Sequence, residues 1–586
     1  MATDAPQKPS HIREFTLRSV TVGLIVALVI GASYPYIVLK FGFGPNISVV
    51  SAFFGFLALG LASRSYNRWE NNIVQTAGTT AGQIAFLCWL LAAFDMLAAE
   101  PGSGFDVHLT RTQTWMWLTS SGLLGVFLAV PLRKHFIEDE NLPFPDGMAA
   151  GETLVTLDAH GPQARKSAFA MMGALVLSGV LFLATVLRWI IDTVPMAVNA
   201  FSARVGLGFG VSLLNIGSGM IIGLRVSASM LIGAIIGWVL APPWLVTRGL
   251  LAGEGRRVDI LLLVMWPATG LLVAGGICAL LLRWGTLVRT FKRLASGGAS
   301  ADLPLRQVWI GSGVCAVLLI VVQSLFFSTP VWQSVLAIGL SVPLGLVALR
   351  VLGETNWGPI STMTNLMQAM FGVIAPGDLR ASMVSSGITG AVAAESEGLM
   401  QDFRAGAIIG STPRILTCMQ LLAVPVGALA LALMYPLLRD TYGIIGDNAQ
   451  LLSPTSQRWV GFAKIVTREL GGAGAISAEA AARLSWMKTS FGVGAVTGVM
   501  LTLLEQRKSW RAFVPSPTGV GIAMLIPISA VTMIFVGAAT DAIWARVSPT
   551  SHEQYSIPTA SGLIAGEALV AVAIPLLVTM GLMQLP

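Results

Sequence analysis

Acidic and amide side chains interrupt the apolar segments of this 586-residue chain at four places. A carboxylate inside hydrocarbon is costly, and proteins that keep one there commonly use it in a substrate, ion or proton pathway. Amide side chains can hydrogen-bond the amide groups of a peptide, and burial favours the protonated form of a carboxyl group. We therefore predict a pathway for polar solutes and protons. Its candidate residues are Asn71, Gln75, Glu152, Glu395, Glu397, Gln401, Asp402 and Glu567.

The spacing of these residues predicts how they face their neighbours. Asn71 and Gln75 are four residues apart, so on a helix they share one face. Glu397 and Gln401 have the same spacing. Each pair is expected to present a polar ridge to one neighbouring helix.

Two of the carboxylates follow a frame of small residues. Glu152 and Glu567 each come directly after a Gly-x-x-x-Gly sequence. Such a frame lets another helix backbone approach closely. Each carboxylate is therefore expected at a helix–helix contact, shielded from lipid.

Structural interpretations remain open beside the functional ones. Glu70 follows Arg68 at a predicted membrane boundary, where an acidic residue suits the solvated start of a helix. Asp402 and Arg404 can form a pair of charges at the membrane interface. The carboxylate after each glycine frame can also serve as a structural hydrogen-bond acceptor between helices.

The elements that position these residues are predicted to be transmembrane helices. Hydrophobic residues make up 54% of the chain and charged residues only 11%, with a mean hydropathy of +0.75. A soluble chain of this length needs more polar surface. At about 20 residues per span, the apolar runs predict an all-α polytopic integral membrane protein of about sixteen helices. The predicted spans lie near 18–39, 44–63, 70–94, 114–131, 167–190, 203–222, 226–242, 258–283, 307–327, 331–350, 360–375, 382–400, 412–436, 487–503, 517–538 and 560–582. The moderately apolar segments 141–156 and 440–486 are left open between re-entrant, interfacial and loop structure.

The positions of Lys and Arg predict the orientation of the chain. They recur in every second predicted loop, which places residues 1–17 in the cytoplasm as an N-terminal tail. The same count predicts that both termini lie on the cytoplasmic side of the plasma (inner) membrane. Two basic segments, around Arg248 and across 437–486, break the pattern. The net charge is +7, but the basic residues do not form a continuous stripe, so no nucleic-acid partner is predicted.

Three pairs of similar segments predict an internal repeat. GPNIS at 44–48 matches GPIS at 358–361, and polar clusters near 70 and 393 open apolar runs. GMAAGETLV at 147–155 matches GLIAGEALV at 562–570. Because the order is kept, we predict two parallel repeats of about eight spans each. The first repeat covers 18–288 and the second 307–586, joined by a charged cytoplasmic linker at 289–306.

Signals for enzymes and metal sites are weak. The four cysteines are scattered without a CxxC pair, and all five histidines lie outside the apolar runs, so no metal and no cofactor is predicted. The chain contains no HExxH and no P-loop. A secondary transporter is the preferred hypothesis. A membrane-embedded enzyme acting on a lipid or polyprenyl substrate, and a passive channel, are its alternatives.

These segments resemble the oligopeptide transporter family, especially its bacterial and yellow-stripe-like branch. The resemblance is carried by YIVLKFGFGPNISVVSAFFGF, RWENNIVQTAG and NLPFPDGMAAGETL in the first half. In the second half it is carried by AAESEGLMQDFRAGAIIGSTPR, AFVPSPTGVGIAML and IPTASGLIAGEAL. The set spans nearly the whole chain in order.

The resemblance implies a symporter of about sixteen helices that uses protons to import its substrate by alternating access. The implied substrate is a small oligopeptide or, alternatively, a metal–chelate complex of the siderophore or nicotianamine-like kind. The family's motif positions fall here on Asn71, Gln75, Glu152, Gln401, Asp402 and Glu567. The expected partners are thus the substrate, protons and the lipid bilayer, with a homo-oligomer left open.

Overall fold

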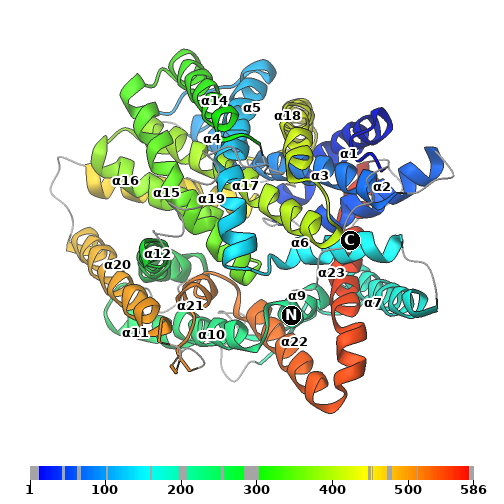
Figure 1. Ribbon diagram of the computed structural model, residues 1–586. Helices are drawn as coiled ribbons and strands as arrows, with labels where there is room; N and C mark the ends of the chain where they lie inside the picture. Colours follow the sequence, from blue (N-terminus) through cyan, green and yellow to red (C-terminus); the bar gives the residue numbers. More distant parts are fainter. Residues whose placement is uncertain are drawn as a thin grey trace.

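The computed structural model describes residues 12–41, 47–62, 67–100, 103–158, 162–196, 207–251, 257–282, 303–445, 451, 453–471, 478–507, 509–510 and 513–579. Nearly all of these residues are helical (Figure 1). The first half contains α1 (Leu17–Phe41), α2 (Ile47–Ala62), α3 (Arg68–Phe86), α4 (Cys88–Ala98), α5 (Arg111–Ala129), a 3₁₀ turn (Val130–Leu132), a π-helix (Lys134–Asp139), α6 (Pro145–Leu157), α7 (Pro162–Val186), β1 (Thr193–Pro195), β2 (Gly208–Gly210), α9 (Leu213–Ile222), α10 (Leu224–Ile235), a second π-helix (Ile236–Leu240), α11 (Ala241–Thr247) and α12 (Arg257–Leu282). The second half contains α14 (Leu305–Phe326), α15 (Val331–Thr355), α16 (Ile360–Ile374), α17 (Leu379–Ile409), α18 (Pro413–Tyr442), α19 (Pro454–Gly471), α20 (Ala478–Glu505), α21 (Pro517–Ala523), α22 (Ile528–Val547) and α23 (Pro549–Thr579).

The expected class, a polytopic helical membrane protein, is confirmed. In the part of the chain that the structure describes, eleven helices are long and apolar enough to cross a membrane. Many of their large apolar side chains are exposed on the outer faces, as helices in contact with lipid require. Within the described ranges, the exception to an all-α fold is a short antiparallel pair, in which Thr193 of β1 lies opposite Gly210 of β2.

Two predicted spans are broken where the backbone cannot continue a helix. The span predicted at 203–222 contains β2 and then only the ten residues of α9, which ends before Gly223 in a positive-φ conformation (φ 85°). The span predicted at 517–538 is divided into α21 and α22, with Pro527 preceding the first residue of α22. Proline lacks the N–H of a helix interior, which explains the break. The segments left open at 141–156 and 440–486 contain α6 and α19.

The long helix α17 forms the centre of the bundle. It packs against α3, α5, α6, α15 and α16 (Figure 1), and nearly all of its residues are buried. Glycines allow the close approaches, because a Cβ at Gly387 would meet the Trp117 ring and one at Gly398 would meet the Gln83 side chain. A helix buried on all sides must pair its own polar side chains with those of its neighbours.

The polar helices α3 and α17 run antiparallel. Gln75 contacts Asp402, whereas Gly390 lies near Leu90, further along the helical run of α3 and α4. The matched polar clusters near residues 70 and 393 lie on these two helices. Halves related by an axis along the membrane normal would place them parallel, so the predicted parallel relation is wrong for these segments.

The first and last described helices run in the same direction. Arg18 of α1 pairs with Glu70 at the start of α3, and Arg68 of α3 pairs with Asp158 after α6, so α6 runs opposite to α3. Ala149 and Ala150 of α6 pack with Ile564 and Ala565 of α23, while Val155 and Ile557 line one cavity. Therefore α23 is antiparallel to α6 and parallel to α1.

The expectation that both termini lie on one face stays a prediction, because residues 1–11 and 580–586 lie outside the described part of the chain. Leu17, at the start of α1, and Thr579, at the end of α23, lie at opposite ends of the helical bundle. Helix α22 forms an antiparallel hairpin with α23, in which Asp541 contacts His552 and Ser556.

Candidate functional site

The centre of the candidate site is a hydrogen-bonded cluster between α3 and α17. Gln75 Nε2 donates to Asp402 Oδ1 at 2.6 Å and to Thr79 Oγ1 at 2.9 Å. Asn72 Nδ2 donates to Gln75 Oε1 at 2.7 Å. Gln75 and Asp402 are fully buried, with exposed fractions of 0%. The structure thus brings together two predicted site residues that are 327 positions apart in the chain.

The first turn of α2 extends this cluster toward Gln401. Thr79 Oγ1 lies 3.3 Å from Ser48 Oγ, which in turn donates to Gln401 Oε1 at 3.5 Å. These contacts place the first described turn of α2 beside the polar groups of α3 and α17.

Asn71 hydrogen-bonds to a different helix from Gln75. Its Nδ2 donates to the Ala52 carbonyl of α2 at 3.0 Å, whereas Gln75 turns to α17. The expectation that Asn71 and Gln75 present one ridge to one neighbour is therefore wrong, although both side chains are buried.

Glu395 faces α18. Gln420 Nε2 donates to the Glu395 carbonyl oxygen at 3.0 Å and to Glu395 Oε2 at 2.9 Å. The aliphatic part of Glu395 packs near Gly122 and Gly125 of α5. This carboxylate therefore lies between α5 and α18, away from the Gln75–Asp402 pair.

Glu397 lies against the start of α16. Its exposed fraction is 3%, and a Cβ added at Gly358 would overlap its carboxylate. Oε1 of Glu397 has no hydrogen-bond partner among the described residues. A buried carboxylate without partners is costly unless it carries a proton or the site admits water or a ligand.

Further unpaired polar atoms lie on the same helices. Asn72 Oδ1, Asp402 Oδ2, Glu395 Oε1 and Gln420 Oε1 are buried and lack a hydrogen-bond partner within the described ranges. Native proteins rarely leave such groups unsatisfied. Their concentration on α3, α17 and α18 marks the region where water, a proton or polar groups of a substrate would be accommodated.

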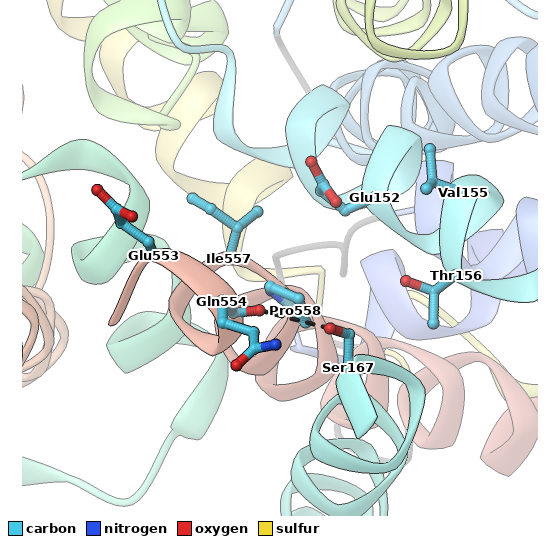
Figure 2. Close-up of a pocket in the computed structure, with 8 residues that line it drawn as sticks. All are labelled: Glu152, Val155, Thr156, Ser167, Glu553, Gln554, Ile557 and Pro558. Atoms are coloured by element: carbon cyan, nitrogen blue, oxygen red, sulfur yellow. Dashed lines mark hydrogen bonds between the residues drawn. The ribbon is translucent and has the colours of Figure 1, made fainter. Parts of the chain in front are cut away.

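Glu152 lies on the other side of α6 from this cluster. Gly147 and Gly151 face α17, where a Cβ would overlap the Gln401 carbonyl and the Ile408 side chain. Glu152 instead lines a cavity of about 280 Å³ between α6, α7 and α23 (Figure 2). The glycine frame thus permits close helix packing, while the carboxylate after it faces an open space.

Glu567 has a different environment from Glu152. Its carboxylate accepts the Ser212 hydroxyl at 3.0 and 2.9 Å and the backbone N–H of Leu214 at 3.0 Å. These bonds satisfy the N-terminal end of α9, which has free N–H groups and a positive dipole end. The glycines before it pack on α7, where Cβ atoms at Gly562 and Gly566 would overlap backbone carbonyls. The two glutamates are therefore similar in sequence frame but not in contacts.

Two structural alternatives from the sequence are excluded by these contacts. Glu70 is not a solvated helix start, because it is 5% exposed and paired with Arg18 of α1. Asp402 is not paired with Arg404, since it bonds to Gln75 while Arg404 Nη1 donates to Asn141 Oδ1 at 3.0 Å.

One contact near the site was missed by sequence reasoning. Asn356 Nδ2 donates to Asp146 Oδ1 at 2.7 Å, and the Asp146 backbone N–H donates to Asn356 Oδ1 at 3.1 Å. Phe144 N–H also donates to the Gly353 carbonyl at 2.9 Å. We call this set the Asp146–Asn356 clasp. It joins the start of α6 to the end of α15, and Asn356 has a left-handed conformation with φ 62°. The only sequence signal was Asn-Trp-Gly-Pro at 356–359, which is typical of a turn.

A second missed feature is a buried charged network beside the π-helix. His135 was predicted to lie outside the apolar runs; its exposed fraction is 0%, and its Nε2 lies 3.0 Å from Glu140 Oε1. Glu140 also pairs with Arg350 of α15. Among the described residues, no group of three or more His, Cys, Asp or Glu side chains could hold a metal ion.

Comparisons of the sequence with known proteins identify one family and several relatives. The sequence model described as "OPT oligopeptide transporter protein" matches residues 14–578. The chain is 24% identical to a putative oligopeptide transporter of Haemophilus influenzae, with 87% of each chain covered. It is 24% identical to the probable metal-nicotianamine transporter YSL8 of Arabidopsis thaliana, covering 97% of this chain and 86% of that one. It is 23% identical to the iron-phytosiderophore transporter yellow stripe 1 of Zea mays, covering 93% and 88%.

Proposed function

The chain belongs to the OPT oligopeptide transporter family, and from this we propose that it is a proton-coupled symporter of small oligopeptides that works by alternating access. The family and the relatives are transporters, so the membrane-embedded enzyme hypothesis is set aside. A passive channel stays an alternative that uphill accumulation would exclude.

The observation that carries the proposal is the Gln75–Asp402 bond between the antiparallel helices α3 and α17. Around it lie amide groups with both donors and acceptors, which match the N–H and C=O groups of a peptide. The first turn of α2 supplies Ser48 to the same place. A substrate amide can replace the Gln75–Asp402 bond with an equivalent one, so binding would be coupled to the relative position of α3 and α17.

Glu397 is our candidate for the residue that carries the coupling proton. Its buried Oε1 without a described partner favours a protonated carboxyl group in this conformation. When the site opens to water, the same group can release its proton. Glu395 is less suited, because Gln420 already donates to it. In the same proposal Glu152 belongs to the pathway, whereas Glu567 serves mainly as a helix cap.

We further propose that the fold has about sixteen helices in two repeats, at 18–288 and 307–586, with the linker at 289–306. The antiparallel course of α3 and α17 favours inverted repeats over parallel ones. Reciprocal packing supports this, because α7 packs on α23 while α12 packs on α20. Glycine pairs mediate both contacts: Gly562 and Gly566 in the first, Gly494 and Gly498 in the second.

The proposed location is the plasma (inner) membrane, with the tail 1–17 in the cytoplasm. The basic residues before α1 favour this side. The parallel course of α1 and α23 then favours a C-terminus on the opposite side. A homo-oligomer is compatible with the exposed apolar helix faces and would be tested by the mass of the purified protein in detergent.

Import of metal–chelate complexes is the second candidate function. It is favoured by the relatives from Arabidopsis thaliana and Zea mays, whose names state metal-nicotianamine and iron-phytosiderophore transport. A chelate of this kind carries several carboxylates, so it would favour basic groups in the site. The described cluster instead presents amides and carboxyl groups. This difference is why we place peptides first.

The purified chain in proteoliposomes tests both candidates. An inward proton gradient is applied with a library of di- and tripeptides and, separately, with iron–nicotianamine. We expect internal acidification and accumulation above the external concentration with at least one peptide, and collapse of accumulation by a protonophore. Accumulation of iron–nicotianamine but of no peptide would make metal–chelate import the first candidate function. The absence of proton-coupled accumulation with every substrate would refute symport.

A further inference from the structure

The cavity between α6, α7 and α23 is separate from the α3–α17 cluster. Glu152 and Thr156 of α6 line it on one side, Ser167 of α7 on a second, and Gln554 and Ile557 of α23 on a third (Figure 2). Its volume of about 280 Å³ is near the lower end for ligand pockets, which begin at roughly 300 Å³. The space therefore suits one small molecule of about dipeptide size.

The polar atoms of the cavity are mainly hydrogen-bond acceptors. Glu152 and Thr156 are four residues apart on α6 and so lie on one face. The Ser167 hydroxyl donates its proton to the Gln554 carbonyl at 3.5 Å, which leaves its lone pairs to accept from a ligand. The Gln554 backbone carbonyl has a further lone pair for a ligand, because residue 558, its usual helical partner, is a proline without an N–H. Glu152 Cδ and its oxygens point from α6 toward the α23 side of the cavity, whereas the Glu553 carboxylate points away from it (Figure 2).

The charge of the cavity is negative and is not matched by a described ion pair. No described basic residue lines the cavity, and Asp158 at the end of α6 is paired with Arg68. Among the residues that the structure describes, no salt bridge involves Glu152. A divalent metal ion would need about six oxygen ligands, usually including more than one carboxylate. A primary ammonium group needs only three acceptors and one negative charge, which this cavity offers.

We propose that this cavity binds the free ammonium group of a small substrate, with Glu152 as its counter-ion and Thr156, Ser167 and Gln554 as further acceptors. The proposal rests on the proposed peptide transport and deepens it, because it assigns the amino end of the peptide to a second subsite. This subsite lies between the cytoplasmic ends predicted for α6 and α7. Only α6 separates this subsite from Gln401 of α17, because Gly147 and Gly151 on the opposite face of α6 pack against α17. A substrate that leaves the cluster toward the cytoplasm would meet it next.

The test compares a dipeptide that has a free amino terminus with its N-acetylated form. The probes are alanyl-alanine amide and N-acetyl-alanyl-alanine amide, measured by thermal shift and by uptake with the full-length protein. We expect the wild type to favour the free amine by about tenfold, the usual effect of one charge-assisted hydrogen bond. Glu152→Gln should reduce this preference to within about twofold. The matched control is Glu100→Gln, at an exposed site paired with Lys464, and it should keep the wild-type preference.

A second variant guards against a folding defect in Glu152→Gln. Thr156→Val removes one acceptor but keeps the charge, so it should lower the preference by about threefold. Equal binding of both probes by the wild type would overturn the proposal, as would a full preference retained by Glu152→Gln. Peptide accumulation without any preference for the free amine would refute this subsite but not transport. Amine-selective thermal shifts without proton-coupled accumulation would refute symport but support the subsite.

Discussion

The side-chain amide nitrogen of Gln75 on α3 lies 2.6 Å from Oδ1 of Asp402 on α17, and both residues are fully buried. Asp402→Ala leaves one N–H of the buried Gln75 amide without its acceptor, while the bond to Thr79 remains, and should lower the free energy of unfolding by about 1–3 kcal/mol. A double-mutant cycle with Gln75→Ala should give a coupling energy of about 0.5–3 kcal/mol. Thermal unfolding in detergent measures it. In the control pair, Gln75→Ala and Thr540→Ala on α22, the two losses of unfolding free energy should simply add. If the losses for Gln75→Ala and Asp402→Ala also simply add, the bond between these residues contributes nothing.

Replacing Glu397 should abolish the proton-driven accumulation of substrate but leave the exchange of substrate across the membrane. Glu397→Gln keeps the size of the side chain but cannot carry a proton that is released on opening. We expect substrate counterflow to continue at a rate within about threefold of wild type, while accumulation driven by a proton gradient is lost. Uptake into proteoliposomes with and without an imposed gradient distinguishes the two. Glu100→Gln should retain both activities, and gradient-driven accumulation by Glu397→Gln would remove this residue from the coupling mechanism.

The sequence predicted the polar residues of the centre but not how they pair. Gln75 and Asp402 were selected because amide and carboxyl groups at membrane depth are costly, and both are indeed buried in the bundle. Their bond joins positions 327 residues apart, and the local spacing of either helix contains no information on such a contact. The four-residue spacing failed for Asn71 because the neighbour on one side is α2 and on the other α17.

The helix boundaries were predicted well where apolar runs are long and poorly where breaks depend on single residues. The run at 517–538 is apolar throughout, and only Pro527 indicated that it becomes two helices. The similar frames at Glu152 and Glu567 suggested equivalent sites, but the surroundings come from α7, α9 and α23, whose packing no local motif encodes.

Gly358 should tolerate no side chain while Glu397 keeps its length. A Cβ at Gly358 would overlap the Glu397 carboxylate, so Gly358→Ala is expected to lower the free energy of unfolding by about 1–3 kcal/mol. Glu397→Asp shortens the neighbour and should restore at least half of the loss in the double variant. Thermal unfolding of the four proteins tests this. Gly339→Ala on α15, where a Cβ meets nothing within 4 Å, should be neutral or slightly stabilising.

The two ends of the chain should be labelled from opposite sides of the membrane. The starting protein has alanine in place of its four cysteines, Cys88, Cys278, Cys315 and Cys418. In one derivative a cysteine replaces Arg13, and in a second derivative a cysteine is added after Pro586. Because α1 and α23 are parallel, a membrane-impermeant maleimide added to intact cells should react with only one of the two. We expect that one to be the C-terminal cysteine. Equal protection of both sites until the membrane is permeabilised would restore the topology with two cytoplasmic termini.

The Asp146–Asn356 clasp should contribute both stability and transport, and two substitutions of Asn356 can separate its parts. Asn356 has φ 62°, a conformation that costs a residue with a plain Cβ about 1–2 kcal/mol but costs glycine little. Asn356→Gly therefore loses the two hydrogen bonds to Asp146, whereas Asn356→Ala loses them and adds strain. We expect Asn356→Gly to be about 1–2 kcal/mol less stable than wild type, and Asn356→Ala about 1 kcal/mol less stable again. Because the clasp fixes the start of α6 beside α15, both variants should slow uptake more than they weaken substrate binding in thermal-shift titrations. Wild-type stability and uptake in Asn356→Gly would show that the Asn356 side chain is not needed to hold the start of α6, because the Phe144–Gly353 backbone bond remains in this variant.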